Sequence, residues 1–445
     1  MRSLLLYLGL ILGLFSSLPV ASAQTPARDR HVIVISLDGF AAYALHDPAI
    51  PLPNLRALAS QGVVAEAMIP INPTVTWPNH TTLVTGVSPE RHGLLYNGLP
   101  VRADAGSTTA PVRIEPHVDK SELVLAPTVY DLAHAAGLTT AEVDWVAIEN
   151  APTITWAFPE FSRPQAPLAR EMVQTGAIAE DELQTFAKAP ITFRDDVWTR
   201  AAEHIITAHK PNLLLFHLLT TDTVQHQYGA RTLGAQTALV LADARVGQLV
   251  DAVRRAGILE TTTFLVVSDH GFKTYKRRIR PNVILKAHGL GDRAWAVVAG
   301  GTANIYVTAG DKAQTIGDVK SAFVGIEGVS MVLTPTEFPQ YGYPSPDRLP
   351  RMGEVVIAAQ DGFAFDGATE GEPVSDVAAG SSPGTHGYLN TDPDMHAIFI
   401  ASGAGVKRGA TLGVIRNLDV APTIATWLGL TMPDVEGRPL MAILP

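Results

Sequence analysis

The sequence predicts an α/β fold with a mostly parallel central sheet and helices on both faces. Two observations predict it. Several short runs are apolar and rich in β-branched residues, which is typical of strands buried on both faces, as in HVIVISL at 31–37 and TTFLVVS at 262–268. Stretches with helical spacing separate these runs, and alternation of strands and helices implies parallel strands joined by helical crossovers.

The individual elements are predicted from the same patterns in chain order. We expect strands at His31–Leu37, Val63–Ile69, Leu138–Val146, Asn212–Leu219, Thr262–Ser268 and Met395–Ala401. We expect helices at Pro53–Gln61, Pro127–Ala136, Phe193–His209, Leu233–Ala256 and Leu418–Leu428. Glycines at 62, 137 and 257 directly follow three of the helical stretches, as helix-ending residues do.

The N-terminus has the pattern of a secretory signal peptide. A positive start, an apolar run over Leu4–Leu14 and an Ala-Ser-Ala site at 21–23 predict cleavage, so residues 1–23 are expected to be removed. An uncleaved anchor is the alternative. No later run offers the roughly 20 apolar residues of a membrane span, so we expect an exported protein, periplasmic or secreted, with no membrane span after cleavage.

Composition limits the possible partners and ligands. The chain of 445 residues has no cysteine, so a bound metal would have only His and carboxylate ligands. A formal charge of −10 argues against a nucleic-acid polymer as partner, because that binding usually needs basic patches. The sequence leaves the oligomeric state open.

Four polar residues follow predicted strands. Asp38, Thr76, Asp222 and Asp269 each come just after one, and ligands of parallel sheets bind at the carboxyl ends of the strands. We therefore expect these four segments to meet at one edge of the sheet. Thr76 is expected just before a helix N-terminus, where the helix dipole favours negative charge.

The same segments carry possible metal ligands. Asp222 and His226 are four residues apart and share a helix face. Asp269 and His270 are adjacent and converge only if the strand has ended, for which Gly271 supplies freedom. With Asp38 and with His386 on a Gly-rich loop, six nitrogen and oxygen ligands suit two metal ions. Zinc, manganese and iron all fit such ligands.

These motifs together resemble a known family. PTVTWPNHTTLVTG with HGLLYN, VISLDGF, TTDTVQHQYG, VVSDHGF and GTHGY occur in the order seen in the nucleotide pyrophosphatase/phosphodiesterase branch of the alkaline phosphatase superfamily. The resemblance spans most of the chain. It implies an alkaline-phosphatase-like fold and two zinc ions.

The resemblance also implies a role for each residue. Asp222, His226 and His386 would hold one zinc, and Asp38, Asp269 and His270 the other. Thr76 would contact the second metal and carry a covalent nucleotidyl intermediate, and Asn97 would donate to a phosphate oxygen. Trp77 stands where the family usually has Phe or Tyr and offers a platform for the substrate substituent.

The implied function is hydrolysis of nucleotide phosphodiester or pyrophosphate bonds to nucleoside monophosphates, so a small-molecule substrate is expected. The alternatives are a phosphodiesterase or phosphonate hydrolase acting on a lipid headgroup or other non-nucleotide substrate, and a zinc-binding protein without turnover. Residues 24–445 are expected to form one catalytic domain with a cap inserted at about 273–382. A separate second domain is the alternative.

The remaining histidines are interpreted as structural. His80 and His92 are expected to fix the turn and helix around Thr76 by hydrogen bonds. His217 lies inside an apolar strand and is expected to be a hydrogen-bonded core residue. His204, His209 and His288 are expected at the surface.

Overall fold

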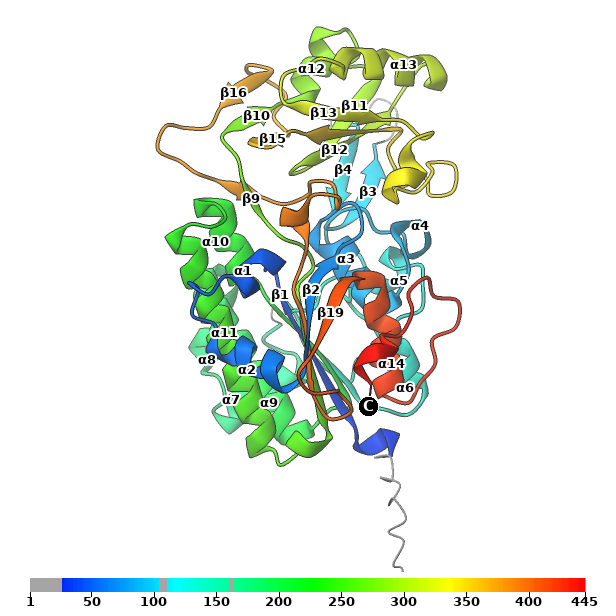
Figure 1. Ribbon diagram of the computed structural model, residues 1–445. Coiled ribbons are helices and arrows are strands. Elements are labelled where there is room, and N and C mark those ends of the chain that lie inside the picture. The colour runs from blue at the N-terminus through cyan, green and yellow to red at the C-terminus, as the bar shows by residue number, and fades with distance from the viewer. Residues whose placement is uncertain (1–25, 104–109, 161–162, 445) are drawn as a thin grey trace, which may run out of the picture.

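A computed structural model describes residues 26–103, 110–160 and 163–444. The expected signal peptide lies outside the described residues. Figure 1 shows a large sheet with helices on both sides and a second, smaller sheet above it. The expected α/β architecture is confirmed.

The central sheet has eight strands, and only β18 runs antiparallel to its neighbours. In spatial order the strands are β19 (Ala410–Arg416), β2 (Val63–Ile69), β18 (Phe399–Gly403), β8 (Thr262–Val267), β1 (His31–Leu37), β7 (Leu213–Leu218), β5 (Thr140–Val143) and β6 (Trp156–Phe158). The carboxyl ends of β1, β7, β8 and β5 therefore meet at the same edge of the sheet.

The side chains of strand β1 show why helices pack on both faces of the central sheet. Ile33 and Ile35 belong to one hydrophobic cluster, whereas Val32 and Val34 belong to the other, because successive side chains point to opposite faces. The first face is covered by α1 (Ala42–His46), α2 (Pro53–Gln61), α7 (Pro167–Thr175), α8 (Glu180–Thr185), α9 (Ile191–His204) and α11 (Leu233–Arg255). The second is covered by α3 (Thr76–Thr85), α6 (Val129–Ala135) and α14 (Val420–Trp427).

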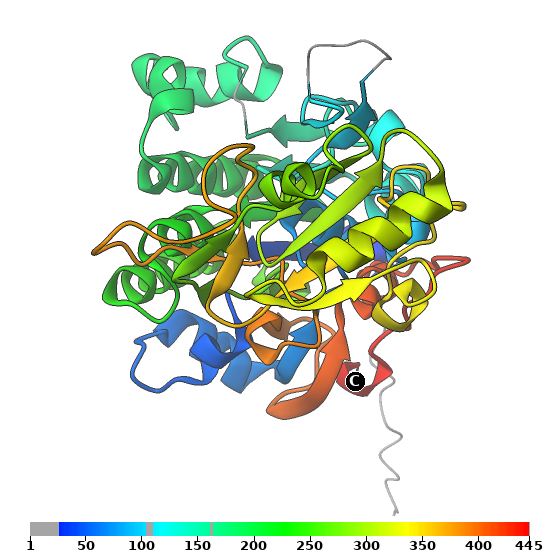
Figure 2. The same cartoon turned by 90° about the horizontal axis from the view of Figure 1, so that it is seen from above.

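A second, antiparallel sheet lies over the carboxyl edge of the first (Figures 1 and 2). Its order is β11 (Ala294–Ala299), β12 (Thr302–Val307), β14 (Val355–Ala359) and β13 (Val329–Leu333). Helices α12 (Pro281–Ala287) and α13 (Lys312–Phe323) pack on one face. The other face packs on Leu95 and Tyr96, in the segment that follows α3.

The chain enters and leaves this region through two paired strands. β9 (Lys273–Thr274) pairs antiparallel with β17 (Gly384–Thr385), so the segments that follow Asp269 and precede His386 run side by side. The remaining strands and α-helices of the described residues are β3 (Leu99–Arg102) with β4 (Val112–Glu115), β15 (Phe363–Phe365) with β10 (Arg277–Ile279) and β16 (Val374–Asp376), and helices α4 (Pro89–His92), α5 (Lys120–Leu123) and α10 (Thr220–Tyr228).

Most expected elements match within two residues, and three differ. The strand expected at 138–146 covers only Thr140–Val143 because the chain leaves the sheet at Asp144, where φ is positive. The strand expected at 395–401 begins only at Phe399, after a short 3-10 turn over Pro393–Met395. The helix expected at 193–209 ends at His204 and continues as the π-helix η3 (Ile205–His209).

Candidate active site

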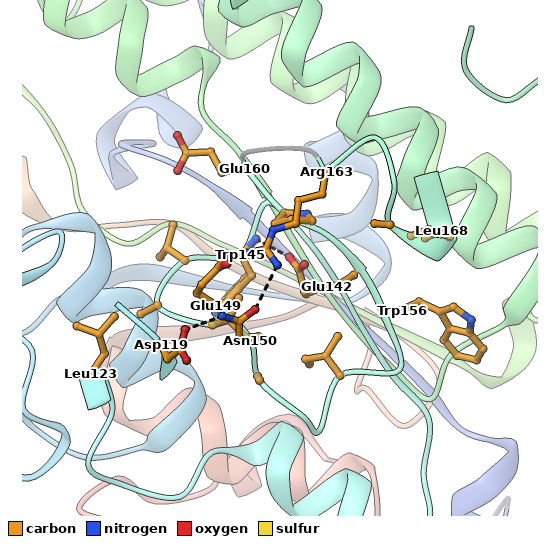
Figure 3. A pocket seen from close by; sticks show the side chains of 18 of the residues that line it. Asp119, Leu123, Glu142, Trp145, Glu149, Asn150, Trp156, Glu160, Arg163 and Leu168 are labelled. Carbon is orange, nitrogen blue, oxygen red and sulfur yellow. Dashed lines mark hydrogen bonds and ion pairs between the residues drawn. The ribbon is translucent and has the colours of Figure 1, made fainter. Parts of the chain in front are cut away.

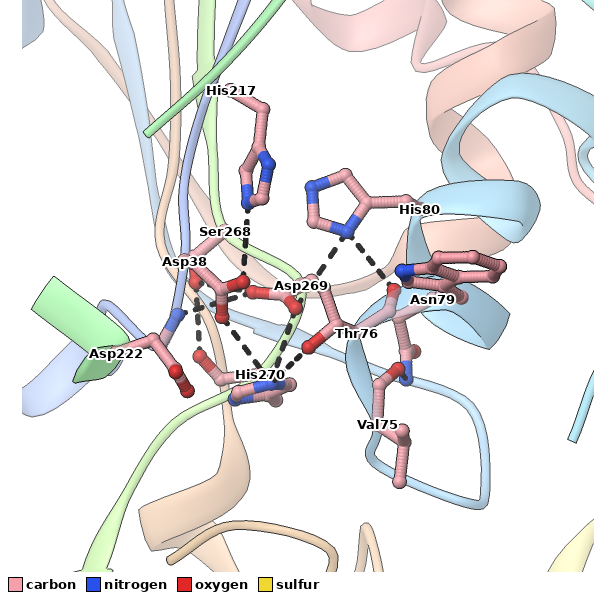
Figure 4. A network of polar contacts seen from close by, with 12 residues as sticks. Asp38, Val75, Thr76, Asn79, His80, His217, Asp222, Ser268, Asp269 and His270 are labelled. Atoms are coloured by element: carbon pink, nitrogen blue, oxygen red, sulfur yellow. Dashed lines mark hydrogen bonds and ion pairs between the residues drawn. The ribbon is translucent and has the colours of Figure 1, made fainter. Parts of the chain in front are cut away.

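The residues after the strands meet at the carboxyl edge of the central sheet, as Figure 4 shows. Asp38 follows β1 and Asp269 follows β8, and both side chains are fully buried. Asp222 lies in the first turn of α10, which begins directly after β7. The structure brings together all four segments that were expected to converge.

The first group contains Asp38, Asp269 and His270. The His270 Nε2 atom lies 3.4 Å from Asp38 Oδ1 and 3.1 Å from Asp269 Oδ2. The second group contains Asp222, His226 and His386, in which Asp222 Oδ1 lies 3.3 Å from His226 Nε2 and 3.8 Å from His386 Nε2.

The two groups are adjacent. The imidazole rings of His270 and His386 stack with centroids 3.7 Å apart, so one histidine of each group touches the other. The donor atoms of Asp222, His270 and His386 also lie within 4.8 Å of one another.

Each histidine is oriented by its second nitrogen. The Nδ1 atoms of His226, His270 and His386 lie 3.0, 3.1 and 2.9 Å from the backbone carbonyls of Gly384, Gly271 and Thr74. Because a carbonyl only accepts, Nδ1 carries the proton and the Nε2 lone pair faces the carboxylates. This is the arrangement that metal-binding histidines adopt.

The carboxylates are held in the same way. The backbone N–H of Gly39 donates to Asp269 Oδ1 at 3.1 Å, and His217 Nε2 lies 3.1 Å from Asp38 Oδ2. The opposite oxygens have no hydrogen-bond donor: Asp38 Oδ1, Asp269 Oδ2 and Asp222 Oδ1. Burying a carboxylate oxygen without a hydrogen-bond donor costs free energy, so these oxygens are suited to bind cations.

The pKa shifts of the site residues also favour a metal site. Burial and the neighbouring Asp269 and Asp222 raise the pKa of Asp38 well above its ordinary value, because negative charges crowd together there. Burial lowers the pKa of His270 to about 4. Burial, with His270 and His226 nearby, lowers the pKa of His386 to about 3. Both rings are therefore neutral at pH 7, as a metal ligand requires.

Gly271 has a steric role. Its φ is not positive, and a Cβ built there would lie 2.0 Å from the Asp394 carbonyl oxygen. Its N–H donates to the Met395 carbonyl at 2.9 Å. The expected freedom of the glycine backbone is thus not the reason for a glycine here. Close approach of the 394–395 backbone requires the absence of a side chain beside Asp269 and His270.

Thr76 is the first residue of α3, with Val75 as its N-cap, and not the residue before the helix as expected. Its side chain is buried, and Oγ1 lies 3.4 Å from His270 Nε2. The hydroxyl thus sits at the positive end of a helix dipole and beside the first group.

A hydrogen bond to the backbone of the residue after Thr76 holds Asn97 close to the start of α3. The N–H of Trp77 donates to Asn97 Oδ1 at 2.9 Å, which leaves the amide nitrogen of the exposed Asn97 side chain as a donor group. The preceding residue is anchored to the second sheet: Asn304 Nδ2 donates to the hydroxyl of Tyr96 at 2.7 Å. The second sheet therefore helps to position Asn97.

Trp77 lines a cavity of about 680 Å³. Figure 3 shows this cavity with Trp145, Glu142 and Arg163 among the side chains around it. Trp145 and Trp156 also line it. Its acidic lining residues are Asp119, Glu142, Glu149, Glu160 and Glu171, against one arginine, Arg163. Arg163 is paired with Glu149, so the cavity has an acidic and aromatic character.

Sequence reasoning missed two residues that contact the site. His217 is buried and hydrogen-bonded as expected, but its Nε2 bonds Asp38 and its Nδ1 lies 3.2 Å from Asp144 Oδ2. Burial lowers the pKa of His217, but its bonds to Asp144 and Asp38 outweigh this and raise it well above its ordinary value. Asp144 directly follows β5, but the expected strand at 138–146 contained it, so the rule that identified Asp38 could not find it from the sequence.

The other histidines differ in whether they meet the expectation from the sequence. His80 and His92 hold the Thr76 helix: His80 Nδ1 lies 2.9 Å from the Thr76 carbonyl, and His92 Nε2 lies 3.1 Å from Thr82 Oγ1. His204 and His209 are 10% and 19% exposed, so they are partly buried and still reach the surface, whereas His288 is exposed as expected.

Comparison with known proteins agrees with this architecture. A family model described as "Type I phosphodiesterase / nucleotide pyrophosphatase" matches residues 32–389. The chain belongs to this family. The resemblance read from the motifs is therefore confirmed.

Two curated relatives and two solved structures illustrate the match. Human ectonucleotide pyrophosphatase/phosphodiesterase family member 1 is 25% identical over 94% of this chain, which spans 41% of that relative. Mouse family member 7 is 22% identical over 95% of this chain and 89% of the relative. Murine and human member 5 structures share the fold, with TM-scores of 0.72 and 0.71 at 20% identity, covering 94% and 93% of this chain and 100% of each solved chain.

Over residues 26–103, 110–160 and 163–444, none of the helices combines the length and apolarity that crossing a bilayer needs.

Proposed function

We propose that this chain is an exported, two-zinc phosphodiesterase that cleaves nucleotide diesters and pyrophosphates to nucleoside monophosphates. The observation that carries the proposal is the pair of adjacent His/Asp groups beside the Thr76 hydroxyl, with carboxylate oxygens that lack hydrogen-bond donors. A solved relative, an inactive variant of murine member 5 in complex with AMP, supports a nucleotide as the substrate class.

The residues would divide between two ions. Asp38, Asp269 and His270 would hold one zinc, and Asp222, His226 and His386 the other. Two such cations would neutralise the carboxylates and polarise the phosphoryl group, as two-metal sites do. Thr76 Oγ would attack phosphorus and displace the leaving alcohol or phosphate, and water would then hydrolyse the threonyl phosphodiester.

The other residues would orient the substrate. The Asn97 amide nitrogen would donate to a phosphoryl oxygen, which favours the charge that develops there. Trp77 would pack against the substituent in the cavity. Residues 273–382, inserted between His270 and His386, would form a cap that confines the substrate.

The test is hydrolysis of the p-nitrophenyl ester of thymidine monophosphate by wild type, Thr76→Ala and Thr76→Ser. Thr85→Ala is the matched control, because Thr85 lies at the other end of α3 and bonds the Thr81 carbonyl. We expect Thr76→Ala to lose at least about 10³-fold in kcat/KM, as loss of a nucleophile does. Chelation should abolish activity and zinc should restore it. Activity that survives both Thr76→Ala and chelation would refute the proposal.

A second candidate substrate is a diester with a cationic headgroup. The cavity beside Trp77 favours it, because ionised carboxylates such as Asp119 and Glu160 and the indole rings that line it both attract cations. Comparing p-nitrophenyl phosphocholine with the thymidine ester distinguishes the two. A higher kcat/KM for the choline ester would make the headgroup diester the substrate.

Export is proposed from the N-terminal pattern alone. Sequencing the N-terminus of the protein recovered outside the cytoplasm should give Gln24 as the first residue. A start at Met1 would contradict cleavage.

A further inference from the structure

Two histidines and a glutamate form a cluster outside the candidate active site. Glu171 lies in α7, His204 ends α9 and His209 ends η3. The Nε2 atoms of both histidines lie 2.8 Å from the same oxygen, Glu171 Oε1. All three donor atoms lie within 4.8 Å of one another.

The cluster lies at the opposite end of the sheet from the candidate active site. His209 precedes β7, whereas Asp222 follows it, and the six residues of that strand span roughly 17–20 Å. Trp156, the first residue of β6, stacks on the His209 ring with centroids 4.5 Å apart. The cluster shares no residue with either His/Asp group near Thr76, although Glu171 and Trp156 also line the cavity beside Trp77.

The backbone brings the two histidines to one face. Residues five apart in an α-helix point about 140° away from each other, because the helix has 3.6 residues per turn. In the π-helix η3, the N–H of Lys210 donates to the Ile205 carbonyl, five residues earlier, at 3.1 Å. This wider turn brings the rings of His204 and His209 together, with centroids 5.9 Å apart. Such π-turns are rare and occur frequently at functional sites.

The distances suit a small cation. Tetrahedral zinc with bonds of about 2.0–2.1 Å separates its ligand atoms by about 3.3 Å. The distance from each nitrogen to Glu171 Oε1 would therefore lengthen by about 0.5 Å, from 2.8 Å. The side chains are 10%, 19% and 35% exposed for His204, His209 and Glu171, so an ion can reach them from solvent and a water can complete its coordination.

We propose that Glu171, His204 and His209 bind a third divalent metal ion, zinc, separate from the catalytic metals. Imidazole nitrogens with one carboxylate suit zinc, copper and nickel, and exclude calcium and magnesium, which prefer oxygen ligands. The ion joins α7 to the end of α9. Its role is structural, because the cluster has no candidate nucleophile and lies away from Thr76.

The test is a metal count on full-length protein dialysed against buffered zinc. Wild type is compared with His209→Gln, whose amide can still bond Glu171 but ligates zinc poorly, and with the double variant His204→Asn/His209→Gln. His288→Gln, at an exposed histidine after α12, is the matched control. We expect wild type and control to bind one more zinc per chain than the double variant.

The design separates this proposal from that of the catalytic site. The readout is a difference of one equivalent between variants, whatever number of metals the Thr76 site holds. Hydrolysis of the thymidine ester should stay within about twofold of wild type in the double variant, which also shows that it folds. Equal zinc content and equal zinc affinity in wild type and the double variant would overturn the proposal.

A second measurement uses thermal unfolding. Zinc added to zinc-depleted Asp222→Asn protein, in which one catalytic group is impaired, should still raise Tm, and the rise should shrink when His204→Asn/His209→Gln is added. An unchanged rise would show that zinc stabilises the protein from elsewhere and would also count against the third site.

Discussion

Replacing His217 by glutamine tests whether the site depends on a residue that touches no substrate. His217 is fully buried, with Nε2 3.1 Å from Asp38 Oδ2 and Nδ1 3.0 Å from the Asp144 carbonyl. Glutamine can reach one of these partners and not both, because its amide lacks the second nitrogen of the ring. His217→Gln should therefore leave either Asp38 or Asp144 without its partner.

We estimate the loss of activity in His217→Gln from the contact that the substitution removes. A hydrogen bond to a charged group is worth about 1.5–3 kcal/mol, which corresponds to roughly 10- to 150-fold. Loss of a residue that orients a metal ligand typically costs about 10–100-fold in metal affinity or activity. We expect kcat/KM for the thymidine ester to fall by about 10–100-fold at limiting zinc, and to recover in part at high zinc.

The assay is kcat/KM measured against zinc concentration in a metal buffer. His92→Gln is the matched control, since His92 is also fully buried but bonds Thr82 and not a site carboxylate. A His217→Gln enzyme with wild-type activity and zinc dependence would refute the reasoning. Equal losses in both variants would assign the effect to packing.

Three further predictions concern other parts of the molecule. Burial raises the pKa of Glu142 from an ordinary 4.5 to about 8, so between these pH values the folded state holds a proton that the unfolded state has released, and this group lowers stability progressively as pH rises from about 4.5 to 8. Glu142→Gln should therefore raise Tm at pH 8, with a gain in unfolding free energy of at most about 4–5 kcal/mol, and should change Tm little at pH 4.5. Equal changes at both pH values would contradict the shift. Asn97→Ala should reduce kcat by about 10²–10³-fold, as loss of one preorganised donor does, and an unchanged kcat would remove Asn97 from the reaction. Gly271→Ala should lower both zinc content and Tm, because its methyl group would overlap the Asp394 carbonyl, while Gly257→Ala, at a glycine with open space around it, should leave zinc content unchanged.

The sequence alone predicted some features of the structure and not others. Strands such as His31–Leu37 were predictable because burial on both faces requires an unbroken apolar run, and that run is local. The convergence of Asp38, Asp222 and Asp269 was also predictable, because residues directly after neighbouring parallel strands lie at one edge of the sheet. The motif order then identified the family, which the match over residues 32–389 confirmed.

Contacts between segments distant in the chain required the tertiary structure. The pairing of His217 with Asp38 and Asp144 depends on which strands are neighbours, and β1, β7 and β5 lie side by side although 179 residues separate Asp38 from His217. The cluster of Glu171, His204 and His209 depends on a π-turn that no pattern in the sequence indicates. Local composition determines which segments become strands and helices, but the identity of a side chain's partner depends on how those segments pack in three dimensions.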